Sequence, residues 1–168
     1  MINQGIKNHK MNKYFLFAFA LLAFVIISFK QTHEPSDFCN SVEGKQKCKD
    51  ALKPGFQYDA TKVTKVTFST KKDFKELEVP LYIGEKYRFV FNSEGNPQPV
   101  DIEVYDNKFE SRKRKLLFSS RDFPVEQREF IFEPVRAKKV FIDYAVPPTT
   151  DSTKKGCVVF AIGYKIGK

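Results

Sequence analysis

Residues Cys157 to Ile166 read CVVFAIGYKI, and this stretch decides the fold. Every residue from Val158 to Ile162 is apolar, so an extended segment would bury both of its faces here. A strand that is buried on both faces lies inside a sheet, with the core on one side and a further covering element on the other. The segment therefore predicts a central strand in a sheet whose outer face is also covered.

The chain before this strand contains further segments of strand character, which turn-forming residues separate. The clearest is YRFVFN, in which Tyr87, Phe89 and Phe91 point to one face of the strand. The other segments are 66–69, 77–81, 100–106, 115–120, 128–134 and 140–146. No long helix alternates with them, so we predict an all-β fold, an antiparallel β-sandwich or jelly roll of about eight strands.

The N-terminal segment has the pattern of an export signal. Lys7, Lys10 and Lys13 precede an uncharged, apolar run from Tyr14 to Phe29. As a helix this run spans about 24 Å, less than the roughly 30 Å of a hydrocarbon core, which favours a cleaved signal peptide. We expect cleavage after Ser28, with a retained anchor as the alternative. The protein is thus predicted to be exported, either periplasmic or secreted, or held at the membrane by this segment.

We divide the chain into 1–29, the signal peptide or anchor; 30–56, a polar linker with a short helical segment; and 57–168, the β-sandwich. Ser36 and Asp37 offer an N-cap for one helix or two short ones, which end at Pro54-Gly55. Gly44 interrupts the helical pattern.

The chain has 3 cysteines, Cys39, Cys48 and Cys157, and an oxidising compartment favours a disulfide among them. In one straight helix the Cα atoms of Cys39 and Cys48 would lie about 13 Å apart, beyond the roughly 7 Å that a disulfide allows. The Cys39–Cys48 bond, which we favour, therefore requires a turn at Gly44. The alternative bond joins either cysteine to Cys157. A reactive thiol or metal ligand has little support, since no histidine lies near the cysteines and the spacing is not CxxC.

The densest charge lies in KFESRKRKLL, between two predicted strands, and we expect it at a hairpin tip. A phosphate or carboxylate ligand would pair with such cations, although a solvated hairpin tip has the same sequence. The candidate ligand-binding residues are Lys108, Arg112, Lys113, Arg114 and Lys115. Lys7, Lys10 and Lys13 contribute to the net charge of +9. The remaining positive charge favours anionic partners, but it is also an ordinary way to keep a protein soluble, and we favour the second explanation. Nucleic acid is not an expected partner, because export removes the chain from it and aromatic residues do not interleave with the basic run.

Catalytic and metal-binding patterns are weak in this sequence. His33 is the only histidine after the export segment and it precedes the predicted fold, which argues against histidine-based triads and metal sites. Oxygen atoms of Asp101, Glu103, Asp106 and Asn107 could hold calcium, but their spacing lacks the D-x-D-x-D-G pattern. Asp101 and Glu103 lie on one strand face, and we favour a solvated face over a calcium site. We predict no catalytic residue, no metal and no cofactor.

The order of GEKYRFVF, VDIEVYD, LLFSS, FIFEP, KVFIDYAV and GCVVFAIGY resembles the bacterial pre-peptidase C-terminal type of β-sandwich. The resemblance covers residues 85–164 and concerns the layout of the strands. The chain departs from that family at Arg136-Ala137-Lys138, where a glycine is usual, and no protease precedes the domain. The helical segment ending in LKPGF also resembles uncharacterised small secreted bacterial proteins. These resemblances imply an accessory or binding module.

The sequence therefore supports a binding or structural module of the bacterial envelope, which contacts protein or anionic polysaccharide through loops, above all 106–115. One alternative is a small carbohydrate-active enzyme that uses Asp or Glu, although nothing in the sequence sets the separation of two carboxylates. The other is an inhibitor or immunity-type protein. The oligomeric state stays open.

Overall fold

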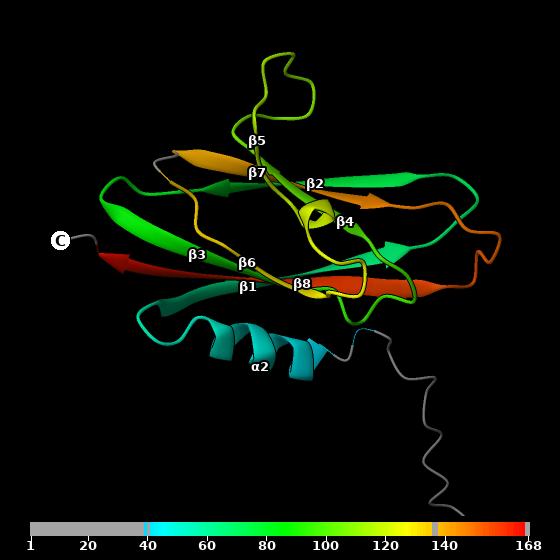
Figure 1. The fold of residues 1–168 in the computed structure, drawn as a ribbon, viewed down its shortest axis with the longest axis horizontal. Helices are drawn as coiled ribbons and strands as arrows, with labels where there is room; N and C mark the ends of the chain where they lie inside the picture. The colour runs from blue at the N-terminus through cyan, green and yellow to red at the C-terminus, as the bar shows by residue number, and fades with distance from the viewer. Residues whose placement is uncertain (1–38, 40, 136–137, 167–168) are drawn as a thin grey trace, which may run out of the picture. The chain divides into compact units, whose positions relative to one another are not determined.

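The computed structural model describes residues 39, 41–135 and 138–166, so the predicted signal segment and the Ser36-Asp37 cap lie outside the described residues. Two four-stranded antiparallel sheets form a β-sandwich, which confirms the predicted fold class (Figure 1). The elements are helix α2 (Ser41–Ala51), strands β1 (Gln57–Thr67), β2 (Asp73–Pro80), β3 (Glu85–Asn92), β4 (Asp101–Tyr105) and β5 (Leu116–Ser119), the 3-10 turn η1 (Ser120–Asp122), and strands β6 (Glu129–Phe132), β7 (Lys139–Val146) and β8 (Lys155–Ile166).

The strands are connected as in a jelly roll. Sheet A has the order β1-β8-β3-β6, and sheet B has the order β2-β7-β4-β5. Successive strands lie in opposite sheets, with the exception of β4 and β5, which pair directly with each other. The predicted hairpin between residues 100 and 120 is therefore confirmed, and its connection is the only one among these strands that starts and ends in the same sheet.

Strand β8 lies inside sheet A, between β1 and β3, as its sequence predicts. Val158, Phe160 and Ile162 point into the core between the sheets. Val159 and Ala161 point to the other face, where they pack against residues of α2. Helix α2 lies beneath sheet A in Figure 1 and is the further covering element that the apolar sequence of β8 requires.

The cysteines form no disulfide with one another, so the predicted Cys39–Cys48 bond and its Cys157 alternative are both wrong. The Cys39–Cys48 bond required a turn at Gly44, whereas α2 continues through Gly44 as one helix from Ser41 to Ala51. Gly44 serves close packing instead, since a Cβ atom there would lie 3.2 Å from Val159 Cγ2.

Cys48 behaves as a small apolar residue of the α2–sheet A interface. It is fully buried, and its Sγ lies 3.9 Å from the carbonyl oxygen of Val159. Burial raises the pKa of the Cys48 thiol to about 12, so the thiolate needed for nucleophilic attack is scarce at neutral pH.

Among the described residues no helix combines the length and the apolar character that crossing a membrane would need.

We expect Phe160→Ala to lower the free energy of unfolding by about 3–5 kcal/mol, because it removes a ring from the centre of the core. The Phe160 ring lies 5.1 Å from that of Phe89 and 5.2 Å from that of Phe91. Urea denaturation followed by circular dichroism measures the change. Ile131→Ala, on edge strand β6 with 51% of the residue exposed, is the control and should cost less than about 1 kcal/mol. Equal losses would contradict the central place of β8.

Candidate functional site

The connection between β4 and β5, residues 106–115, forms a closed loop that stands on the outer face of sheet B (Figure 1). Its two ends are joined at a neck. The Asp106 N–H donates to the carbonyl oxygen of Lys115 at 3.1 Å, and the Lys115 N–H donates to Asp106 Oδ1 at 2.7 Å. A tighter turn inside the loop is closed by the Ser111 N–H, which donates to the Lys108 carbonyl at 2.9 Å. Compact loops whose ends meet in this way frequently carry function. We refer to this segment as the 106–115 loop.

Arg114 anchors the 106–115 loop to sheet B. Its side chain is only 15% exposed and forms an ion pair with Asp143 of β7, whose side chain is 2% exposed. The guanidinium also lies 4.0 Å from Glu76 Oε2 and stacks over the Tyr105 ring at 3.4 Å from the ring centroid. The register of sheet B places Glu76 and Asp143 directly opposite each other on β2 and β7. One arginine therefore joins the loop to the middle of the sheet.

Phe109 provides a second anchor at the other side of the loop. Its N–H donates to Glu76 Oε2 at 2.7 Å, and its ring centroid lies 4.5 Å from that of Phe74 on β2. The Arg114 guanidinium lies over the same Phe109 ring at 5.1 Å. Aromatic and cation–π contacts of this kind each contribute about 0.5–1.5 kcal/mol, so together they fix the orientation of the loop base.

The anchoring carboxylate is held in an environment that disfavours its charge. Burial raises the pKa of Asp143 above its ordinary value, and the ion pair with Arg114 only partly offsets this rise. The nearby Glu76 carboxyl raises the pKa of Asp143 further. Asp143 Oδ1 and Arg114 Nη1 are buried and have no hydrogen-bond partner in the described part of the chain. The stability of the anchor therefore depends on keeping both charges together.

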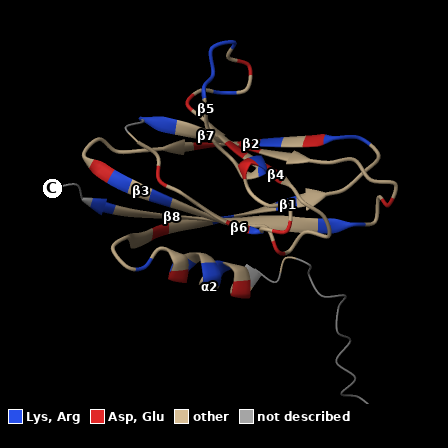
Figure 2. Ribbon diagram, in the orientation of Figure 1, with Lys and Arg blue, Asp and Glu red and all other residues tan. Residues whose placement is uncertain are grey.

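The structure divides the predicted binding residues into two groups. Lys108, Arg112, Lys113 and Lys115 are exposed on the loop, whereas Arg114 is turned toward sheet B. Figure 2 shows the loop as a largely basic projection above sheet B. The only acidic partner found for these exposed cations within the described ranges is Glu110, whose carboxylate lies 3.9 Å from Lys108 Nζ.

Sequence reasoning missed the residues that anchor the loop, Asp143 and Glu76. A signal for Asp143 is present, because it is the one charge inside the apolar run VFIDYAV. A buried carboxylate in such a strand requires a cationic partner. The sequence contains many lysines and arginines, and nothing in the pattern identifies Arg114 as that partner.

The oxygen atoms considered for calcium interact with protein donors. Asp101 Oδ2 lies 2.9 Å from Arg121, and Glu103 Oε1 lies 3.6 Å from the same guanidinium. Asp106 closes the loop neck, and Asn107 Oδ1 accepts the N–H of Lys108 at 3.1 Å. Among the described residues, histidine, cysteine, aspartate and glutamate form no cluster that could hold a metal ion.

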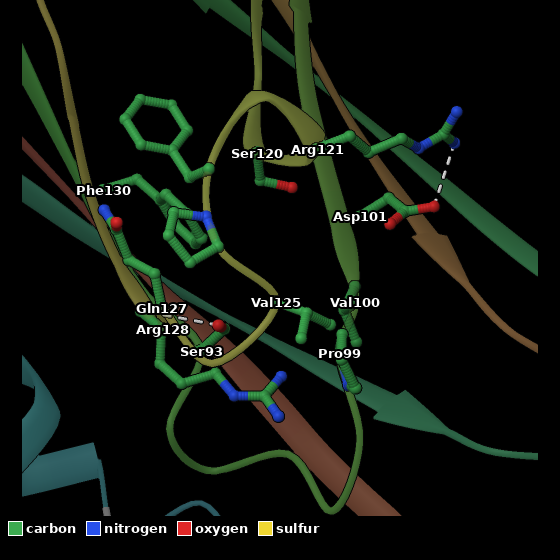
Figure 3. Close-up of a pocket in the computed structure, with 12 residues that line it drawn as sticks. Ser93, Pro99, Val100, Asp101, Ser120, Arg121, Val125, Gln127, Arg128 and Phe130 are labelled. Atoms are coloured by element: carbon green, nitrogen blue, oxygen red, sulfur yellow. Dashed lines mark hydrogen bonds and ion pairs between the residues drawn. The ribbon is translucent and has the colours of Figure 1, made fainter.

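A pocket of about 220 Å³ lies beside the Asp101–Arg121 ion pair, where the 3-10 turn η1 and the segment before β6 cross from sheet B to sheet A (Figure 3). Two polar side chains of its wall are used by the fold. Ser93 Oγ donates to the carbonyl oxygen of Arg128 at 3.1 Å, and Ser120 Oγ accepts the N–H of Ile102 at 2.9 Å. These two hydroxyls and the ion pair therefore support the chain around the pocket.

Comparison with known proteins adds little to this picture. No family model matches the chain. Of the predicted resemblance, the structure shows the β-sandwich. No curated protein matches it either. One solved structure, of a carbohydrate-binding module described as "CBM4 structure and function", is similar with 12% identity and a TM-score of 0.35, over 70% of this chain and 83% of that chain. At this level the similarity supports no conclusion about ligand or activity, and the sandwich is established by the two sheets themselves.

We expect Arg114→Met to lower the free energy of unfolding by about 3–5 kcal/mol at pH 7, because it leaves Asp143 as an unpaired buried charge. The pKa of Asp143 is higher in the folded state, so its contribution to stability is most favourable below about pH 3.9 and declines as the pH rises through the folded-state pKa. Without Arg114 this pKa rises further. The loss caused by the substitution should therefore be smaller at pH 4 than at pH 7, as measured by urea denaturation at both pH values.

Arg112→Met is the matched control, since Arg112 is exposed on the same loop, and its effect should stay within about 0.5 kcal/mol. The double substitution R114M/D143L removes both charges and should recover most of the stability lost in R114M, because apolar replacement of a buried ion pair is often nearly neutral. The anchor described above would be refuted by an R114M protein that is as stable as R112M at pH 7.

Proposed function

We propose that this protein is an exported, non-catalytic binding module that contacts an anionic polymer of the cell envelope through the 106–115 loop. One observation carries the proposal: the fold uses Arg114 to hold the loop in place and leaves Lys108, Arg112, Lys113 and Lys115 exposed at its surface. A loop that is closed at its neck and anchored at its base presents these cations without a large entropic cost on binding.

The strength of exposed ion pairs favours a polymeric ligand. Each exposed pair contributes about 0–1 kcal/mol, so a single carboxylate or phosphate would bind the loop very weakly. A ligand that repeats its negative charge along a chain can engage several cations together. Acidic glycans and phosphate-containing cell-wall polymers both have this property, and a polysaccharide with a carboxylate on successive sugars is the simplest representative.

The export part of the proposal is supported by the sequence alone, through Lys7, Lys10 and Lys13 and the apolar run that follows them. The non-catalytic part is supported by the surroundings of the two facing carboxylates on β7 and β2, Asp143 and Glu76. Asp143 and Glu76 face each other, as an acid–base pair would, but both lie against Arg114, and Asp143 is almost fully buried. Neither carboxylate is arranged to receive a substrate.

The test is binding of the domain to polygalacturonate, a polymer with one carboxylate per sugar, measured by affinity electrophoresis and isothermal titration calorimetry. We expect binding that weakens steeply between 50 and 300 mM salt, on the order of tenfold, because exposed charges are screened. Charge reversal of Arg112, Lys113 and Lys115 to glutamate should weaken it by about tenfold or more.

The control reverses Lys62, Lys71 and Lys72, which are exposed outside the loop, and so changes the net charge by the same amount. Equal losses in the two triple variants would show that net charge alone attracts the polymer, and the loop assignment would then be wrong. Tighter binding to single-stranded DNA than to polygalacturonate would refute the proposed ligand class.

A further inference from the structure

A second surface lies away from the 106–115 loop, where a cavity of about 620 Å³ opens at one end of the sandwich. One wall is formed by residues 81–87, which make the turn from β2 to β3 and the first half of β3. The other wall is formed by Glu133, Pro134, Val135 and Lys138, which follow β6. We refer to this surface as the β3 groove.

The β3 groove exists because sheet A is incomplete on this side. Strand β3 pairs with β8 over its whole length, but it pairs with β6 only from Phe89 to Asn92. Continuing the β3–β6 register would place Tyr87 opposite Pro134. Proline has no N–H to donate, so the ladder ends at this point.

The backbone of Tyr87 faces the open side of β3. The Ser93 N–H donates to the carbonyl oxygen of Arg128, on the β6 side of the strand. Backbone groups alternate between the two sides of a strand, so the N–H and carbonyl of Tyr87 point the same way as those of Ser93, into the groove. Among the described residues, no backbone hydrogen bond crosses the groove to Tyr87. The N–H and the carbonyl oxygen of Tyr87 are thus directed as they would be to pair with a neighbouring strand.

The walls of the groove carry unusually exposed apolar side chains. Tyr82 is 72% exposed, Ile83 86% and Val135 85%. Single exposed apolar residues are common, but three that line one cavity mark an interaction surface. The side chains of an extended ligand that alternate toward the protein would pack against them.

The groove carries more positive than negative charge. The carboxylate of Glu85 accepts a hydrogen bond from the Tyr87 hydroxyl, and that of Glu133 pairs with Arg88 at 2.7 Å. Lys86 and Lys138 are exposed, and no ion pair is found for either within the described ranges. The Tyr87 hydroxyl is neutral and leaves the Glu85 carboxylate charged, whereas Glu133 is balanced by Arg88. Two lysines against one carboxylate leave the groove with an excess of positive charge, which favours a ligand with acidic side chains.

We propose that the β3 groove binds an extended segment of a partner protein, with alternating apolar and acidic residues, as an additional strand on β3. A peptide fits better than a sugar chain because the open donor and acceptor of Tyr87 belong to one residue and match a strand's own backbone. Glu133, Pro134, Val135 and Lys138 border the groove on the side opposite β3. This interaction is separate from polymer binding by the 106–115 loop.

The probe is a capped synthetic peptide of alternating valine and aspartate, about seven residues long, titrated into the domain by calorimetry. We expect a Kd below about 1 mM, and N-methylation of the peptide amides that face β3 should weaken binding by about tenfold, because it removes the strand hydrogen bonds and keeps the side chains. Replacing the aspartates with lysines should weaken it as well. Hydrogen exchange of the Tyr87 amide should slow when the peptide is bound.

The protein variants are Ile83→Asp and Val135→Asp, which change exposed side chains and should weaken peptide binding by about tenfold or more. Val42→Asp is the matched control, because Val42 is 74% exposed on α2, outside the groove, and its substitution should leave binding unchanged. The inference is overturned by no binding at 1 mM, by equal binding of the N-methylated peptide, or by unchanged exchange of the Tyr87 amide. None of these outcomes affects polygalacturonate binding by the 106–115 loop, so the two proposals fail independently.

Discussion

Burial of both faces of β8 is the constraint on which the rest of the structure depends. One face contributes Val158, Phe160 and Ile162 to the core, and the other receives α2. Two glycines near the ends of the strand allow other segments to approach it closely. A Cβ atom at Gly163 would lie 2.8 Å from Leu52 Cδ2, just after α2, and one at Gly156 would lie 2.9 Å from the carbonyl oxygen of Gly95, in the loop between β3 and β4. Because β8 joins β1 to β3, sheet A and the position of α2 both follow from it.

Much of this arrangement could be predicted because it depends on the local spacing of apolar residues in the sequence. Alternating apolar residues located most of the strands, and the two-sided apolar run placed β8 inside a sheet with a further covering element. The predicted segment 66–69 was wrong for the first strand, because β1 runs from Gln57 to Thr67 and most of its residues are exposed or only partly buried, so they show no apolar alternation. The disulfide prediction failed because it rested on the compartment and on a turn at Gly44, whereas helix α2 continues through that glycine to approach Val159. A glycine in a helical pattern indicates either a break or a close contact, and only the three-dimensional neighbours distinguish the two.

The sequence predicts which segment forms the candidate site, but it does not predict which residue of the segment anchors it to the sheet and which residues stay exposed. A run of basic residues between two strands indicates a hairpin tip, and the structure has a hairpin there. Which arginine faces the sheet depends on Asp143 and Glu76, which lie far along the sequence on β7 and β2. The same distinction applies to the β3 groove, where Arg88 and the Tyr87 hydroxyl engage the two carboxylates and leave the lysines exposed. In both places the fold uses some charges and leaves others for a ligand.

The neck of the 106–115 loop also bears on how this protein can change over evolutionary time. The loop joins two neighbouring strands of one sheet, and two hydrogen bonds between Asp106 and Lys115, one of them to the Asp106 carboxylate, close its neck. Lengthening a closed loop costs little, about 0.6 kcal/mol for each doubling of its length. The other connections cross between the sheets, so their lengths are tied to the geometry of the sandwich. Insertions and new sequences at the tip can therefore accumulate with little loss of stability, and homologous chains are expected to diverge most in this loop.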